Sequence, residues 1–143
     1  VSTAVGNWSD VAKAKEAALS QADTGVDFWV GCGDGPTLGQ IEAAKTNGGF
    51  SSGYVGDMSS LGPEVVAVNL IWDMQPLFTR MLEDTQNGTF ANQYYQMGVK
   101  EGVIKVEVPP AFQEKLGPEK LKLLEDTKAK IVAGTLTVPY NPK

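Results

Sequence analysis

The fold is most clearly indicated by Val26–Ala44, which reads Val-Asp-Phe-Trp-Val-Gly-Cys-Gly-Asp-Gly-Pro-Thr-Leu-Gly-Gln-Ile-Glu-Ala-Ala. A short apolar run leads into a glycine-rich turn, and the turn leads into a segment whose apolar residues have helical spacing. The turn contains Gly31, Gly33 and Gly35, which allow the backbone to approach a ligand closely. In open α/β sheets, ligands bind beyond the carboxyl ends of the strands. We therefore predict that this turn is one ligand-facing edge of an α/β domain.

Strands and helices alternate on both sides of this stretch. Strands are expected at Val1–Gly6, Val26–Gly31, Phe50–Val55 and Glu64–Trp72, and helices at Asp10–Ala22, Pro36–Thr46 and Asp73–Gln86. Near-continuous apolar strands that alternate with helices are typical of a parallel sheet covered on both faces. The prediction is an α/β fold with a mainly parallel sheet and helices on both faces. The first four strands should follow a flavodoxin-like order, because crossover connections are right-handed.

The pattern changes after Gly88. Further strands are expected at Asn92–Met97 and Val103–Val108, a charged amphipathic helix at Pro118–Ala133, and an extended or frayed tail at 135–143. At 143 residues the chain has the length of one domain. No repeat or low-complexity linker divides it, so we expect a single α/β lobe over residues 1–143.

Composition narrows the classes of function. The net charge of −5 argues against nucleic acid as a partner. The absence of histidine removes the commonest general base and metal ligand. No nucleophile is paired with a base, so no catalytic residue, metal site or cofactor is expected. Cys32 is either a reactive thiol at a helix start or a small buried residue.

Several side chains should meet at the carboxyl edge of the sheet. Trp8 follows the first expected strand and Trp72 ends the fourth. Two indoles at one edge of the sheet suit stacking on a flat ligand; the alternative is that each tryptophan packs in the core or in an interface. Asp34 lies in the glycine turn and Asp57 just past a strand end. Asp57 either accepts hydrogen bonds from a ligand or closes its own loop by accepting from Ser59 or Ser60.

The turn also invites comparison with dinucleotide-binding sites. Gly31–Gly35 has the pattern Gly-x-Gly-x-Gly rather than Gly-x-Gly-x-x-Gly, because Pro36 takes the last place. The interpretation as an NAD site is supported only by Asp57, an acidic residue about twenty residues after the turn. An NAD-type enzyme is therefore the weakest alternative, and another kind of ligand-facing loop is favoured.

The order of several segments resembles the C-terminal half of the basic membrane lipoprotein family. The segments are Gly6–Asp10, Val30–Gly35, Gly53–Met58, Leu61–Pro63, Val65–Trp72 and Met97–Lys105, and together they span nearly the whole chain. Members of this family are substrate-binding proteins of ABC transporters with a two-lobed type I periplasmic-binding fold. The resemblance implies that the chain is no enzyme and that it captures a solute for import.

The resemblance also implies a site. Family members bind purine nucleosides or similar small solutes between their lobes, and Trp8 matches the position that stacks on the base. The implied ligand-binding residues are Trp8, Gly31, Gly33, Asp34, Asp57 and Trp72. Val55 stands where the family has an aspartate that holds ribose, and Trp72 where a lysine is frequent. A purine base or another flat solute is therefore expected rather than a nucleoside.

Partners and location follow from the same resemblance. The chain would be the C-terminal lobe of a longer protein, with residues 74–88 packing on the other lobe. A homodimer or a separate first-lobe chain could take that lobe's place. An ABC transporter permease is the implied membrane partner, and the full-length protein would be periplasmic or on the cell surface, anchored by lipid. The alternative is a stand-alone flavodoxin-like module with an interaction or regulatory role.

Overall fold

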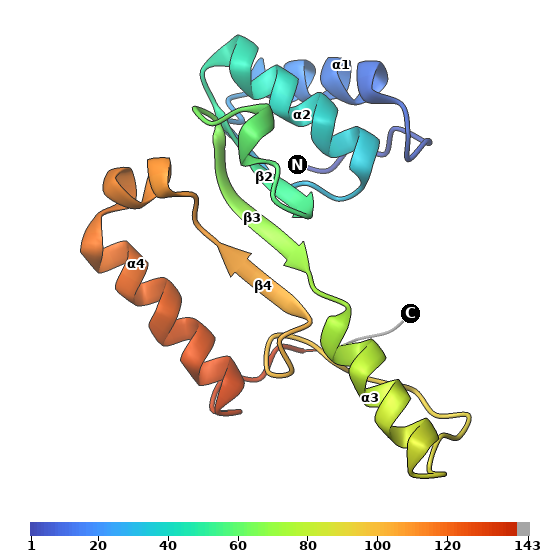
Figure 1. The fold of residues 1–143 in the computed structure, drawn as a ribbon. Coiled ribbons are helices and arrows are strands. Elements are labelled where there is room, and N and C mark those ends of the chain that lie inside the picture. Colours follow the sequence, from blue (N-terminus) through green and yellow to red (C-terminus); the bar gives the residue numbers. More distant parts are fainter. Residues whose placement is uncertain (140–143) are drawn as a thin grey trace. The chain divides into compact units, whose positions relative to one another are not determined.

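The structure is a computed structural model that describes residues 1–139 (Figure 1). Its elements are α1 (Val11–Ala22), β1 (Phe28–Trp29), α2 (Asp34–Asn47), β2 (Phe50–Val55), the short 3-10 helix η1 (Ser59–Leu61), β3 (Val66–Trp72), α3 (Gln75–Gln86), β4 (Ile104–Glu107) and α4 (Pro110–Val132). Two compact units form. Unit 1 comprises Val1–Ile71 and Val106–Lys115, and unit 2 comprises Trp72–Lys105 and the segment that starts at Leu116.

The sheet has four strands in the order β1-β2-β3-β4. Strand β1 is parallel to β2, with Phe28 opposite Phe50, and β2 is parallel to β3, with Gly53 opposite Asn69. Strand β4 runs in the opposite direction to β3 (Figure 1). The sheet is therefore mixed but mostly parallel, with helices around it, and the predicted α/β class is confirmed.

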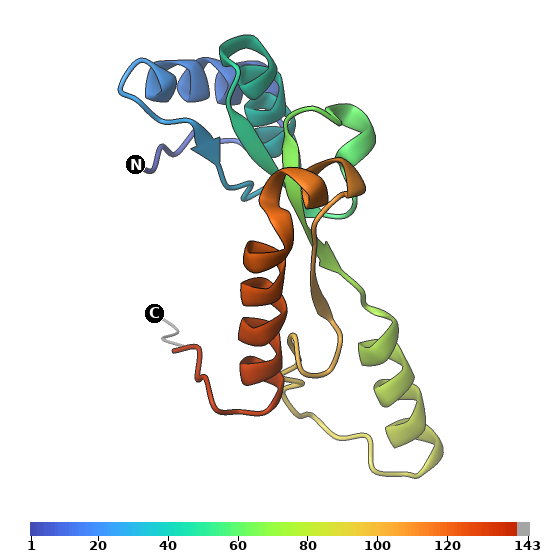
Figure 2. The same cartoon turned by 90° about the vertical axis from the view of Figure 1, so that its left-hand side faces the viewer.

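Helices α1 and α2 lie side by side in unit 1, as both ribbon views show (Figures 1 and 2). Gly39 permits this approach, because a Cβ there would lie 2.5 Å from the carbonyl oxygen of Val11. Below the helices is one cluster of buried side chains, namely Ala18, Trp29, Ile41, Ala43, Ala44, Val65 and Val66. Gly48 ends α2 in the left-handed conformation, with φ at 71°.

The first expected strand does not form. Val1–Gly6 has no regular secondary structure, and β1 pairs directly with β2. The predicted order of the first four strands is thus wrong at its first member, since this β-prone segment finds no strand partner among the described residues. Helix α1 is capped by Asp10, whose Oδ1 accepts from the Lys13 N–H at 2.9 Å.

Two expectations fail in the second half of the chain. Asn92–Met97 forms no strand, because its side chains turn toward α3 instead of pairing in the sheet. Helix α4 begins at Pro110, eight residues before the expected start, and is two helical segments joined at Gly117, where φ is 75°. The part of the expected tail at 140–143 lies outside the described residues. Within residues 1–139, no helix has both the length and the apolar character that a membrane span requires.

Candidate functional site

The glycine turn after β1 is built around Trp8. A Cβ at Gly33, where φ is 128°, would lie 2.7 Å from the indole ring of Trp8. Gly35 donates its N–H to the Trp8 carbonyl oxygen at 3.0 Å, and a Cβ at Gly35 would lie 2.7 Å from the Cα of Ser9. These glycines therefore hold the backbone of Trp8 against the turn, while 71% of the tryptophan remains exposed.

The turn is also closed from within. Gly31 donates its N–H to Oγ of Ser52 at 2.8 Å, and the Thr37 hydroxyl donates to the Gly33 carbonyl oxygen at 2.6 Å. The backbone N–H groups of Gly31 and Gly35 are thus engaged in hydrogen bonds inside unit 1. The turn thus leaves exposed the indole that it supports.

Asp34 and Cys32 differ from their neighbours in the turn because both are exposed. Asp34 is the first residue of α2, where a carboxylate is favoured by the helix dipole. Of the two alternatives for Cys32, the small buried residue is wrong, because Cys32 is exposed. Burial alternates from β1 into the turn, so that Trp29 and Gly31 are buried and Cys32 is exposed.

Asp57 closes its own loop just beyond the end of β2. Its Oδ1 accepts from the Ser59 N–H at 2.9 Å and from Nδ2 of Asn69 at 2.8 Å. The hydrogen bonds from Ser59, followed by the one from Asn69, lower the pKa of Asp57 below its ordinary value. The loop-closing alternative is therefore realised, and it leaves an exposed, ionised carboxylate at the carboxyl edge of the sheet.

Asn69, on β3, organises this loop and was missed by the sequence reasoning. It is 2% exposed. Its Nδ2 also donates to Oγ of Ser59 at 2.9 Å, and its Oδ1 accepts from the Met58 N–H at 3.1 Å. Gly53 lies opposite on β2, where any Cβ would collide with this Oδ1. The available signal was one amide in the otherwise apolar run Val-Val-Ala-Val-Asn-Leu-Ile-Trp.

Val55 has strained backbone at the end of β2. Its φ is 68°, and it is the one non-glycine residue with positive φ in the described part of the chain. This conformation is unusual for a β-branched residue and costs free energy. The strain lies two residues before Asp57, at the edge where the candidate site was expected, and strained backbone gathers at functional sites.

Trp72, the last residue of β3, belongs to unit 2 and is 41% exposed. The structure thus brings Trp8, Gly33 and Gly35 into contact and links Asp57 to Asn69 within unit 1, whereas Trp72 belongs to unit 2. Asp73 follows, and Lys105 donates to its Oδ2 at 2.7 Å. That hydrogen bond, followed by one from the Gln75 N–H, lowers the pKa of Asp73.

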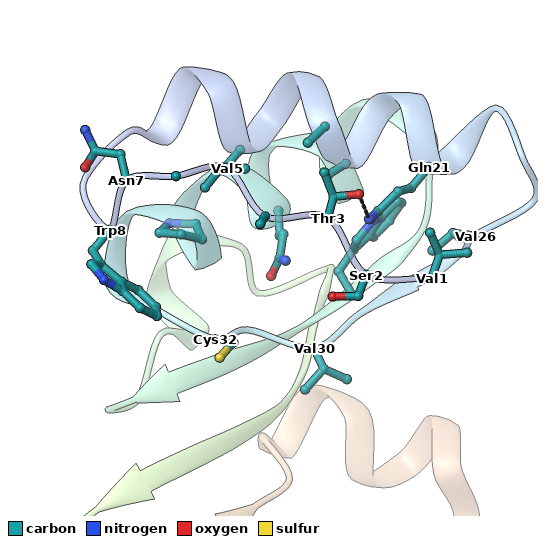
Figure 3. Close-up of a pocket in the computed structure, with 18 of the residues that line it drawn as sticks. Val1, Ser2, Thr3, Val5, Asn7, Trp8, Gln21, Val26, Val30 and Cys32 are labelled. Carbon is teal, nitrogen blue, oxygen red and sulfur yellow. Dashed lines mark hydrogen bonds between the residues drawn. The ribbon is translucent and has the colours of Figure 1, made fainter. Parts of the chain in front are cut away.

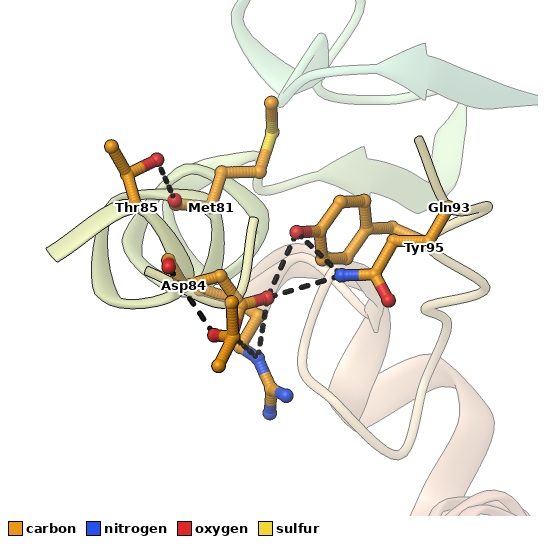
Figure 4. Close-up of polar contacts among 7 residues, drawn as sticks. Met81, Asp84, Thr85, Gln93 and Tyr95 are labelled. Carbon is orange, nitrogen blue, oxygen red and sulfur yellow. Dashed lines mark hydrogen bonds and ion pairs between the residues drawn. The ribbon is translucent and has the colours of Figure 1, made fainter. Parts of the chain in front are cut away.

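Unit 2 contains a second polar cluster that sequence reasoning missed, centred on Asp84 of α3 (Figure 4). The Asp84 carboxylate, 8% exposed, accepts from the hydroxyl of Tyr95 at 2.8 Å and from Nε of Arg80 at 3.1 Å. Gln93 and Thr89 also donate to it. The hydrogen bond from Tyr95, followed by those from Arg80 and Thr89, lowers the pKa of Asp84. This cluster fastens residues 88–95 to the helix.

One cavity lies wholly within unit 1 (Figure 3). It has a volume of about 630 Å³ and lies between Val1–Trp8, α1 and β1, with Trp8 and Cys32 at one end. Among the described residues, no group of three or more His, Cys, Asp or Glu side chains could hold a metal ion.

A family model described as "ABC transporter substrate-binding protein PnrA-like" matches residues 1–141. A purine-binding protein of Brucella abortus is 27% identical over 132 residues, which are 92% of this chain and 36% of that protein. The transcriptional activator protein med of Bacillus subtilis is 25% identical over 115 residues, 77% of this chain and 36% of that protein. The chain thus spans little more than a third of the length of these curated relatives.

Solved structures resemble the fold. An ABC transporter solute-binding protein from Aeropyrum pernix K1 superposes with a TM-score of 0.80 at 16% identity, covering 99% of this chain and 48% of that one. A transcriptional activator of the comK gene from Bacillus halodurans superposes with a TM-score of 0.74 at 24% identity, covering 89% of this chain and 44% of that one. In both comparisons the fold of this chain corresponds to somewhat less than half of the solved chain.

Proposed function

Because the chain belongs to the PnrA-like family of ABC transporter substrate-binding proteins, we propose that it is the C-terminal lobe of an extracytoplasmic solute-binding protein. The lobe captures a purine base, a nucleoside or a similar flat solute in a cleft closed by a second lobe, and delivers it to an ABC transporter permease. The observation that carries this proposal is Trp8 at the carboxyl edge of the sheet, an exposed indole that lies against Gly33 and whose backbone is held by Gly35.

An indole in this position suits a flat aromatic solute. Its ring face can stack on a heterocycle, and stacking on a base contributes about 1–3 kcal/mol. Asp57 supplies an ionised acceptor for ring or exocyclic N–H groups from the same edge of the sheet. The name of the Brucella abortus relative, a purine-binding protein, supports the same class of solute.

We infer that a base is preferred over its nucleoside. By the family resemblance, Val55 and Trp72 stand where other members have an acid and a lysine that hold the sugar. A site that lacks partners for ribose hydroxyls gains nothing from them and must still desolvate them. Adenine should therefore bind more tightly than adenosine.

Isothermal titration calorimetry of the complete two-lobed protein with adenine and adenosine tests this proposal. Trp8→Ala should weaken adenine binding by about tenfold or more, the loss of roughly 1.4 kcal/mol of stacking. Trp8→Phe is the matched control, which keeps an aromatic face and most of the affinity. Equal adenine affinity in Trp8→Ala and wild type would contradict the role of Trp8, and clearly tighter adenosine binding would contradict the preference for a base.

The second lobe is part of the proposal. Phe78 and Leu82 on α3 are 63% and 58% exposed within this chain, and the curated relatives have nearly two thirds of their length outside the matched part. We infer that residues 74–88 pack on that other lobe, supplied by the same protein, a separate chain or a second copy. Sedimentation equilibrium of residues 1–143 alone checks this. Self-association that Phe78→Ser and Leu82→Ser abolish is expected, and a monomer at millimolar concentration would contradict it.

The cellular location is proposed on the same ground. An importer's solute-binding component works in the periplasm or at the cell surface, where a lipid anchor on the full-length protein would hold it near the permease. Fractionation of cells that express the full-length protein, with and without globomycin to block lipoprotein processing, tests this. Recovery in the cytosol would contradict it.

A second candidate is a ligand-sensing regulator, favoured by the Bacillus subtilis relative that is named a transcriptional activator. In that case this lobe would bind the solute and other parts of the protein would act on transcription. The net charge of −5 argues against DNA contact by this lobe itself. Solute uptake in a deletion strain distinguishes the two, because only the importer component is required for transport.

A further inference from the structure

Asn69 is a buried amide within strand β3, and its hydrogen bonds all go to the loop that follows β2. Its Oδ1 accepts from the Met58 N–H at 3.1 Å, and its Nδ2 donates to Oδ1 of Asp57 at 2.8 Å and to Oγ of Ser59 at 2.9 Å. The orientation of the amide is fixed by chemistry, because a backbone N–H can only donate and an ionised carboxylate can only accept. Asn69 therefore binds three consecutive residues of the loop at once.

Gly53 on β2 provides the space that this amide occupies. It lies opposite Asn69 in the register of the two strands, and a Cβ there would collide with Oδ1 of Asn69. Glycine within a strand weakens it and often marks the close approach of another group. Any side chain at this position would push the amide away from the Met58 N–H. Gly53 and Asn69 thus act as a matched pair on the loop after β2.

The loop that Asn69 holds begins with strained backbone. Val55 has a φ of 68°, which is unfavourable for a β-branched residue. Such a conformation persists only where the surrounding contacts leave the chain no alternative. The hydrogen bond between Met58 and Asn69 is one of these contacts, since it fixes the chain three residues after Val55. The strain at Val55 therefore accompanies a fixed position of Asp57, two residues further on.

The Asp57 carboxylate has limited capacity left for a solute. Its Oδ1 accepts from the Ser59 N–H at 2.9 Å and from Asn69, which fills both lone-pair positions of that oxygen. The hydroxyl of Ser59 also donates to the carboxylate. A carboxylate has about four acceptor positions in all, so about one remains for a donor from outside the loop. The side chain is exposed, and a solute can reach that position.

Building on the proposed function, we propose that Asn69 is a positioning residue, which acts through Asp57 to select heterocycles that carry an exocyclic amino group. Asp57 follows β2, and the turn that supports Trp8 follows the neighbouring parallel strand β1, so both lie at the same edge of the sheet. The solute ring stacks on Trp8 while its amino group donates one N–H to Asp57. An amino group conjugated to a ring is a donor only and matches an acceptor-only carboxylate, whereas the ring N–H of a free purine can move between two nitrogens.

Adenine and unsubstituted purine are the diagnostic ligands, because they differ only in the exocyclic amino group. Calorimetry of the complete two-lobed protein should show adenine binding about tenfold more tightly than purine, as expected for a hydrogen bond to a charged group. Asp57→Ala should bring this ratio to about one, since the acceptor is gone. Asn69→Ala should lower the ratio by about threefold or more, while purine affinity stays within about twofold, because stacking on Trp8 is retained.

Further variants separate positioning from general damage to the fold. Asn69→Asp keeps the shape and the acceptor for Met58 but loses the donor to Asp57, so it should lower the ratio as Asn69→Ala does. Gly53→Ala should lower it from the opposite strand, and should add little once Asn69→Ala has removed the colliding amide. In the Asp57→Ala background, Asn69→Ala should change the ratio no further. Val68→Ala, on the other face of β3, is the matched control and should leave the ratio unchanged.

Equal weakening of adenine and purine by Asn69→Ala and Asn69→Asp, at an unchanged ratio, would give Asn69 a purely structural role and would overturn the proposal. A ratio near one in the wild type would also overturn it. If Trp8→Ala still weakens both ligands in that case, the proposed function stands and only the role of Asn69 is lost. Failure of the wild type to bind either ligand would contradict both.

Discussion

The two units of this chain differ sharply in what they bury. Unit 1 places nine apolar residues in its interior, among them Trp29, Ile41 and Val66, whereas in the described part of unit 2 only Val103 and Asp84 are buried. Large apolar side chains remain exposed in unit 2, namely Phe78, Leu82, Phe90, Tyr94 and Leu123. Unit 1 therefore has a core of its own, and unit 2 has the composition of a surface that packs on a partner.

The largest effect should come from the core of unit 1. Ile41→Ala should lower the free energy of unfolding by about 3 kcal/mol, because Ile41 is 1% exposed and the cavity left behind cannot collapse fully. Leu82→Ala in unit 2 is the matched control and should stay within about 0.5 kcal/mol. Urea denaturation followed by circular dichroism measures both. Similar losses in the two variants would show that the units are equally well packed.

A smaller loss is expected from the polar network beside that core. Asn69→Ala should cost about 2 kcal/mol, because it leaves the Met58 N–H without its acceptor and removes a donor from Asp57. The pKa of Asp57 should rise toward its ordinary value, which NMR titration detects. Asn92→Ala, at an exposed position, is the control and should change neither quantity.

Substitution of Val55 should increase the stability of unit 1, in contrast to the two preceding variants. Val55→Asn should stabilise unit 1 by about 1 kcal/mol, because asparagine tolerates a φ of 68° better than a β-branched residue does. Val55→Ile keeps the branching and should give no gain. Thermal unfolding of the three proteins provides the measurement. A loss of stability in Val55→Asn would mean that packing of the half-buried valine outweighs its backbone strain.

The smallest effect is local and belongs to unit 2. The pKa of Asp84 is lowered in the fold, so its stabilising contribution is present above the unfolded pKa of about 3.9 and is lost as the pH falls through the folded value. Acidification through the folded pKa of Asp84 should therefore loosen residues 88–95, which hydrogen exchange can measure. Asp84→Asn should remove this titration from the segment, and Glu83→Gln should retain it. Pepsin cleavage of 88–95 that does not depend on Asp84 would contradict the prediction.

Sequence reasoning succeeded where local signals and tertiary structure agree. Phe50–Val55 is a strand with the predicted bounds, and Gly48 and Gly88 follow the ends of their helices with positive φ. It failed where the outcome depends on partners distant in the chain. Val1–Gly6 has strand composition, but pairing requires a neighbour that residues 1–139 do not provide. Asn92–Met97 alternates like a strand, but Tyr95 and Gln93 bind Asp84 instead.

In the candidate site, too, features that depend on local sequence could be predicted and contacts between distant segments could not. The exposure of Trp8 and the position of Asp57 just past a strand end could be predicted from sequence. The contact between Gly33 and the indole could not, because it joins two segments separated by α1. Asn69 was hidden for a different reason, since one amide within an apolar strand gives no indication of which loop it holds.

The support of Trp8 by Gly33 and Gly35 has a consequence for entropy. A tryptophan on a mobile loop would lose its rotameric and backbone freedom when a solute stacked on it, and that loss would subtract from affinity. Here folding has already ordered the backbone of Trp8 through the Gly35 N–H, and Gly33 provides a flat surface for one side of the ring. A solute would therefore meet a preorganised aromatic plane, and its association would cost the protein little conformational entropy at this residue.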